Sequence, residues 1–261
     1  AAIIALKCET DFVAKNADFV ALTQAILDAA VENKCKTLDE VKALPLGNGT
    51  VQDAVTDRSG ITGEKMELDG YNWIEGAATA IYNHQGKNAL CTIAAFNKPA
   101  DEKVAHEIVM QIAAMNPIAI DEDGVSEEIK QKEIQVAIDK TKAEQVQKAV
   151  EAALKKAGFN LYIAENEEHL NEGIMKGNIT EAQAEEIRQL KAKVAEEKAA
   201  NLPAAMIENI AKGRLGKFLK EVCLLKQEDI MDPKKTVADV LKESDPELKV
   251  VDFKRFTLCA E

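Results

Sequence analysis

The sequence has few aromatic residues, 4% in all, and no apolar run that approaches the roughly 20 residues of a membrane-spanning helix. We therefore expect no contact with a membrane. Cysteine is sparse as well, without any Cys-x-x-Cys pair, and it stands at Cys8, Cys35, Cys91, Cys223 and Cys259. An odd, scattered set argues against a disulfide framework and a structural zinc site, and it favours a reducing, cytoplasmic location.

Motifs for catalysis are also missing. The sequence contains no Gly-x-x-x-x-Gly-Lys-Ser/Thr loop for nucleotide phosphates and no Gly-x-Ser-x-Gly elbow. The histidines, His84, His106 and His169, are far apart in the chain. His106-Glu107 lacks the second histidine of a His-Glu-x-x-His zinc site, and an ordinary helix or core histidine explains it better. We expect no metal, no cofactor, no small-molecule substrate and no enzymatic activity.

Positive charge is in deficit, because 45 acidic residues face 33 basic ones, for a formal net charge of −12. Such a surface repels phosphate backbones unless basic residues are concentrated on one face. One predicted helix carries Lys212, Arg214, Lys217 and Lys220. A solvated helix face explains this small set better than a nucleic-acid site, so no direct binding of nucleic acid is expected.

The pattern of apolar and capping residues predicts both strands and helices. Residues 1–7 are typical of a short strand, and Asn16 is positioned to cap a helix. Thr50 opens a further helix that Ser59-Gly60 should end. The segment 78–96 reads as a β-hairpin around the turn Asn83-His84-Gln85-Gly86, and residues 250–259 read as a final strand.

The middle of the chain predicts two long polar helices. One begins at the cap Ser126 and ends at Gly158, and the other begins at the capping box Thr180-Glu181-Ala182-Gln183. Their narrow apolar stripes and the connector between them suggest an antiparallel coiled-coil hairpin. One uninterrupted exposed helix is the weaker alternative, because Gly158, Gly173 and Gly177 would break it.

The predicted fold class is α+β, with two small antiparallel-sheet/helix subdomains and an inserted antiparallel coiled-coil hairpin. Residues 1–77 form the N-terminal core subdomain, and residues 78–125 with 203–261 form the C-terminal core subdomain. The insertion is 126–202.

Two short segments are candidates for contact with another protein. Thr10-Asp11-Phe12-Val13 places an aromatic ring beside a carboxylate, between a strand and a helix, although a phenylalanine there is also typical of a core. The hairpin tip around His84 combines an aromatic residue, an imidazole and a cation. A solvated turn with a satisfied histidine is the simpler explanation of that tip.

At these residues the sequence resembles the elongation factor Ts family. The resemblance is carried by Cys8-Glu9-Thr10-Asp11-Phe12-Val13-Ala14-Lys15-Asn16, by Glu75-Gly76 with Tyr82-x-His84-x-Gly86, by Gly213-Arg214-Leu215-x-Lys217-Phe218-x-x-Glu221-Val222-x-Leu224, and by Met231-Asp232-Pro233-x-Lys235-Thr236-Val237. It covers residues 1–155 and 203–261, with the motifs in the family's order.

The resemblance implies a guanine-nucleotide exchange factor that releases GDP from elongation factor Tu, the GTPase that delivers aminoacyl-tRNA. It implies that Asp11 and Phe12, flanked by Thr10 and Val13, form a wedge that enters the GTPase, and that His84 lies at the same interface. The alternative is a coiled-coil scaffold protein without exchange activity. Phe12 distinguishes the two, because a scaffold has no need of an aromatic wedge beside Asp11.

Two departures from the family stand out. The small helical domain with which the family normally begins, and the strand that would precede residues 1–7, have no counterpart in the 261 residues, so we expect an exposed sheet edge. Residues 156–202 are longer than the family's usual hairpin. No functional residue is carried over to that segment.

Overall fold

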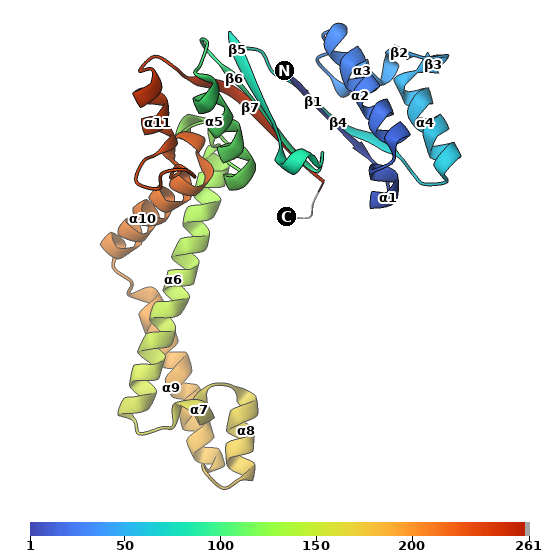
Figure 1. The fold of residues 1–261 in the computed structure, drawn as a ribbon. Helices are drawn as coiled ribbons and strands as arrows, with labels where there is room; N and C mark the ends of the chain where they lie inside the picture. Colours follow the sequence, from blue (N-terminus) through green and yellow to red (C-terminus); the bar gives the residue numbers. More distant parts are fainter. Residues whose placement is uncertain (259–261) are drawn as a thin grey trace. The chain divides into compact units, whose positions relative to one another are not determined.

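A computed structural model of the chain describes residues 1–258, which fold as two compact units (Figure 1). The first unit comprises residues 1–125 together with the chain from Leu219 onward, and the second is Ser126–Phe218. Residues 203–218, which the sequence assigns to the C-terminal core subdomain, therefore belong to the second unit. Helices and small antiparallel sheets coexist, so the predicted α+β class is confirmed.

The first half of unit 1 packs helices on a two-stranded antiparallel sheet of β1 and β4. The core between them contains Leu6, Phe19, Ile26 and Leu68. A second, small two-stranded sheet of β2 and β3 joins α3 to α4. The elements are β1 (Ala2–Lys7), α1 (Asp11–Ala14), α2 (Ala17–Glu32), α3 (Leu38–Ala43), β2 (Pro45–Leu46), β3 (Gly49–Thr50), α4 (Val51–Thr62) and β4 (Glu67–Trp73).

Side-chain caps start these helices as the sequence predicts, but one helix end is wrong. Asn16 accepts a hydrogen bond from Asp18 N, and Thr50 forms a capping box with Asp53. Helix α4 runs through the predicted stop at Ser59-Gly60 and ends at Gly63, whose φ of 73° is the left-handed conformation of a C-cap. A single glycine weakens a helix without ending it, so Gly60 is accommodated inside α4.

The second half of unit 1 is a three-stranded antiparallel sheet in the order β5-β6-β7, packed against helices α5 and α11. The predicted hairpin is the β5–β6 pair, and the final strand ends at Thr257, whereas the predicted end at Cys259 lies outside the described residues. The elements are β5 (Ala78–Asn83), the 3₁₀ turn His84–Gly86, β6 (Leu90–Phe96), α5 (Glu102–Met115), the 3₁₀ turns Glu122–Gly124 and Leu224–Lys226, α11 (Val237–Ser244) and β7 (Val250–Thr257).

The two sheets of unit 1 meet through a small apolar cluster. Ile3 and Ile74 come from the first half, and Ile93 and Ala95 come from β6. The backbone of Gly70 on β4 also lies close to the ring of Phe256 on β7. A Cβ atom at position 70 would be only 2.8 Å from Cε2 of that ring, so only glycine leaves room for it. These buried contacts fix the first half of the unit against the second.

The second unit is a helical hairpin whose long arms, α6 and α9, run in opposite directions (Figure 1). The alternative of one uninterrupted helix is wrong, because the chain turns at Gly158 and Gly177, both with positive φ. The elements are α6 (Glu127–Lys156), α7 (Leu161–Ala164), α8 (Glu167–Met175), α9 (Glu181–Ala200) and α10 (Ala204–Val222), which crosses into unit 1. No helix among residues 1–258 combines the length and apolarity required to cross a bilayer.

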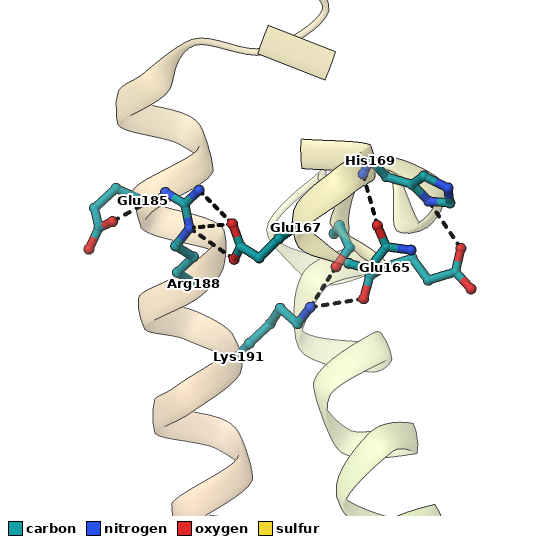
Figure 2. A network of polar contacts seen from close by, with 8 residues as sticks. Glu165, Glu167, His169, Glu185, Arg188 and Lys191 are labelled. Carbon is teal, nitrogen blue, oxygen red and sulfur yellow. Dashed lines mark hydrogen bonds and ion pairs between the residues drawn. The ribbon is translucent and has the colours of Figure 1, made fainter. Parts of the chain in front are cut away.

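The connector of the hairpin is itself folded. Helices α7 and α8 share a core with the arms, built on Leu154, Leu170 and Ile187. Arg188 of α9 pairs with Glu167 at 2.8 and 3.0 Å. Lys191 Nζ donates to the carbonyl oxygens of Ala164 and Glu165 at the end of α7, and Figure 2 shows both sets of contacts. The sequence did not predict this tip, because its short helices depend on contacts with α6 and α9.

Candidate functional site

Helix α1 is a single turn that presents the sequence-predicted candidates at the surface. Thr10 is its N-cap, in an extended conformation, and the Thr10 hydroxyl accepts a hydrogen bond from Val13 N at 3.4 Å. Asn16, two residues beyond the end of the turn, caps α2 in the same way. Two successive caps interrupt the helical path, so a separate turn forms where one longer helix would otherwise begin.

The ring of Phe12 projects into solvent and is 86% exposed. Asp11 is also exposed, and its carboxylate pairs with Lys15 Nζ at 2.9 Å. The hydrogen bond from Lys15, with the charge of its ammonium group, lowers the pKa of the Asp11 carboxyl. Asp11 is therefore ionised at neutral pH beside an exposed aromatic ring, and the interpretation of Phe12 as a core residue is wrong.

The remaining member of the segment, Val13, faces inward. It is partly buried against the core cluster of the first half of unit 1. Adjacent residues of one helical turn lie about 100° apart around its axis, so an inward Val13 turns Phe12 away from the core. In the segment Thr10–Val13, Thr10 is thus the helix cap, Asp11 and Phe12 are exposed, and Val13 packs against the core.

Glu64, which the sequence did not indicate as a functional residue, bonds the N-terminal end of this turn. Glu64 follows α4, and its carboxylate accepts hydrogen bonds from Glu9 N at 3.2 Å, from Thr10 N at 3.0 Å and from the Thr10 hydroxyl at 2.5 Å. More than 50 residues separate Glu64 from Thr10 in the chain. No local pattern around Glu64 indicates this contact, which only the tertiary fold creates.

The second candidate, His84, lies on the exposed turn between β5 and β6. Its Nδ1 is 2.9 Å from the Tyr82 hydroxyl, and the two rings meet edge to face. Among residues 1–258, no hydrogen bond, ion pair or ring contact joins His84 to Thr10–Val13. The structure therefore presents two separate exposed elements on the same unit.

A third polar site lies in an open hollow between α5 and the loop that follows α10. There Glu107 hydrogen-bonds Asp229, which is almost fully buried and whose carboxylate accepts from Met231 N and Asp232 N. Burial, followed by this carboxylate, raises the pKa of the Glu107 carboxyl. The described residues contain no group of three or more His, Cys, Asp or Glu side chains able to hold a metal ion.

Sequence comparison assigns a chain with this fold and these exposed elements to the translation elongation factors. The chain belongs to the elongation factor Ts family, whose sequence profile matches residues 9–260. It is similar to the elongation factor Ts of Phocaeicola vulgatus, 74% identical over 261 residues, and of Bacteroides thetaiotaomicron, 71% identical over 261 residues. Both alignments cover all of this chain and 79% of the relative.

More distant relatives carry the same name. The elongation factor Ts of Porphyromonas gingivalis is 39% identical over 262 residues, covering all of this chain and 75% of the relative. Family membership therefore agrees with the resemblance seen in the sequence.

Proposed function

We propose that this chain is a guanine-nucleotide exchange factor that promotes GDP release from elongation factor Tu during protein synthesis. The observation that carries the proposal is the Phe12 ring, 86% exposed on a turn fixed by side-chain hydrogen bonds. Burying such a ring in a partner stabilises a complex by about 1.5–3 kcal/mol. Family membership supplies the partner, through the name that the relatives share.

In the proposed mechanism, Asp11 and Phe12 enter the GTPase and disturb the loop and magnesium ion that hold the nucleotide phosphates. Thr10 and Val13 fix the pair in position. A phosphate-binding loop and its metal ion depend on close geometry, so a displaced loop releases the nucleotide faster. His84 belongs to the same partner surface in this proposal. No bond is made or broken, and neither nucleic acid nor a small-molecule substrate is required.

Exchange of this kind follows from differential affinity. The chain must bind nucleotide-free elongation factor Tu more tightly than the GDP-bound form, because a ligand shifts an equilibrium only by its preference for one state. Linkage makes the effect reciprocal: GDP weakens binding of this chain by the same factor by which the chain weakens binding of GDP. We expect the protein to act in the cytoplasm, together with its partner.

The coiled-coil scaffold considered from the sequence accounts less well for the structure. A scaffold would explain the helical hairpin, but it gives no role to an exposed phenylalanine held beside an ionised aspartate. Single exposed apolar residues are ordinary on protein surfaces. Phe12 differs from such residues because Glu64 and Thr10 hold its turn through hydrogen bonds, and this favours the exchange-factor proposal over the scaffold.

The test is release of fluorescent GDP from purified elongation factor Tu. Addition of this chain should accelerate release strongly, and titrations with nucleotide-free and GDP-loaded partner should show a clear preference for the empty form. The Asp11→Ala, Phe12→Ala double variant should lose most of that preference while keeping residual binding. A wild-type chain that binds both forms equally and leaves the release rate unchanged would exclude the proposal.

A further inference from the structure

We propose that Glu64 is a positioning residue for the exchange reaction, acting through the exposed Asp11–Phe12 pair. The inference rests on the proposed function and assigns a role to a residue outside the turn itself. Three hydrogen bonds reach one carboxylate, from Glu9 N, Thr10 N and the Thr10 hydroxyl. Hydrogen bonds to an ionised acceptor are stronger than those between neutral groups.

The turn needs this support because little else holds it. Helix α1 has four residues, and a helix of this length is unstable without tertiary contacts. Phe12 and Asp11 face solvent and contribute no packing, which leaves Val13 as the apolar anchor. A single partly buried valine does not fix the rotation of a turn. The carboxylate of Glu64 supplies the missing constraint on the opposite side of the cap.

Glu64 is itself rigidly held at the end of α4. Gly63 N bonds Ser59 O at 2.9 Å, and the Ser59 hydroxyl donates to the carbonyl oxygen of Glu64 at 2.6 Å. The backbone N–H of Glu64 donates to the Thr62 hydroxyl at 3.3 Å. The Glu64 side chain therefore extends from a backbone that is hydrogen-bonded to the end of α4. Its bonds to Thr10 fix the position of Thr10 relative to α4.

A second link joins the same helices. Arg58 Nη1 of α4 lies 3.1 Å from Asp18 Oδ2 in the first turn of α2, just after α1. Arg58 of α4 and Glu64, which follows the C-cap of α4, thus contact the chain on the two sides of the exposed pair, Glu64 before it and Arg58 after it. A wedge that is already oriented loses less conformational entropy on binding, and this preorganisation strengthens the complex.

A mutant cycle tests the inference in the full chain. Glu64→Ala should reduce the rate of GDP release from elongation factor Tu by about tenfold, less than the roughly hundredfold loss that a 1 Å misplacement can cause. In the Asp11→Ala, Phe12→Ala background the same substitution should have no further effect on residual binding to empty partner. A merely structural role would lower binding by the same factor in both backgrounds.

The matched control is Asp57→Ala, which removes one exposed carboxylate from α4 and should leave exchange unchanged. Amide hydrogen exchange of the unbound chain adds a direct readout: Glu64→Ala should lower protection at Glu9 and Thr10, and Asp57→Ala should not. Glu64→Gln keeps one acceptor oxygen and should fall between wild type and Glu64→Ala in both measurements.

The outcomes separate this inference from the proposed function. An active wild-type chain whose Glu64→Ala variant exchanges normally, or loses binding equally in both backgrounds, overturns the role of Glu64 alone. A wild-type chain that does not accelerate GDP release overturns the proposed function and any role of Glu64 in it.

Discussion

The side-chain amide of Gln111 donates a hydrogen bond to Oε1 of Gln227 at 3.1 Å, and both residues are fully buried. Gln111 also donates to Glu228 O and accepts from Ile230 N, while Gln227 donates to Met115 O and Glu221 O. Every amide donor and acceptor of the pair has a partner. The pair therefore ties the end of α10 and the loop after it to helix α5, across more than 110 residues.

Replacing Gln111 by Leu should destabilise the protein substantially. The substitution leaves Ile230 N, Glu228 O and Gln227 Oε1 without their partner, and each buried unsatisfied polar group costs about 1–3 kcal/mol. Chemical denaturation measures the change. Because the two glutamines share one network, the double variant Gln111→Leu, Gln227→Leu should cost less than the sum of the single ones. Additive costs would show that the residues act independently.

The raised pKa of the Glu107 carboxyl should make the free energy of unfolding depend on pH. Its raised pKa means that the folded state binds the proton more tightly, so this group stabilises the fold fully below its unfolded pKa. That contribution is lost as the pH rises through the folded pKa. Glu107→Gln keeps a donor for Asp229 without the charge. At pH 7 Glu107→Gln should therefore have a higher melting temperature than wild type, and this gain should disappear as the pH falls toward 4.

Thermal melts between pH 4 and 8 check the effect of Glu107→Gln. Asp57→Asn is the control, since it removes an exposed carboxylate of α4 and should show no comparable gain at neutral pH. If Glu107→Gln is less stable than wild type at pH 7, the charged carboxylate stabilises the fold, for instance with Lys103 nearby, and the prediction is wrong.

Phe12→Ala should leave the midpoint of thermal unfolding nearly unchanged, because the ring is 86% exposed and its removal takes almost no buried apolar surface from the protein. The same variant should slow GDP release from elongation factor Tu roughly ten- to a hundredfold, the kinetic equivalent of losing a ring buried only in the complex. Phe19→Ala is the matched control. That ring is 6% exposed, so its removal should cost about 3–5 kcal/mol of stability. Normal exchange by Phe12→Ala would remove the wedge from the mechanism.

Two glycines should respond in opposite ways to alanine. Gly60 lies inside α4 with open space around its missing Cβ, so Gly60→Ala should stabilise the protein by about 0.5–1 kcal/mol. Gly70 lies on β4 against Phe256, and an added Cβ would stand 2.8 Å from the ring. Gly70→Ala should lower the midpoint of thermal unfolding, because the ring and sheet must shift. A stabilising Gly70→Ala would mean that the two sheets separate easily.

Much of the local structure could be predicted from the sequence because it depends on neighbouring residues. Asn16, Thr37, Thr50, Ser126, Thr180 and Thr236 all cap helices, and each cap is a contact between residues only two or three positions apart. The hairpin β5–β6 follows from its turn residues in the same way. The candidate segment Thr10–Val13 was also recognisable, since its residues are contiguous.

Contacts between segments that are distant in the sequence could be seen only in the tertiary structure. Periodicity could not distinguish an exposed Phe12 from a buried one, because the direction of its ring depends on the rotation of a single turn. That rotation is fixed by Val13 against the core and by Glu64 from the end of α4. The folded tip of the hairpin and the pairing of Gln111 with Gln227 have the same origin. Such contacts form only after loop closure brings the segments together, and no local propensity encodes them.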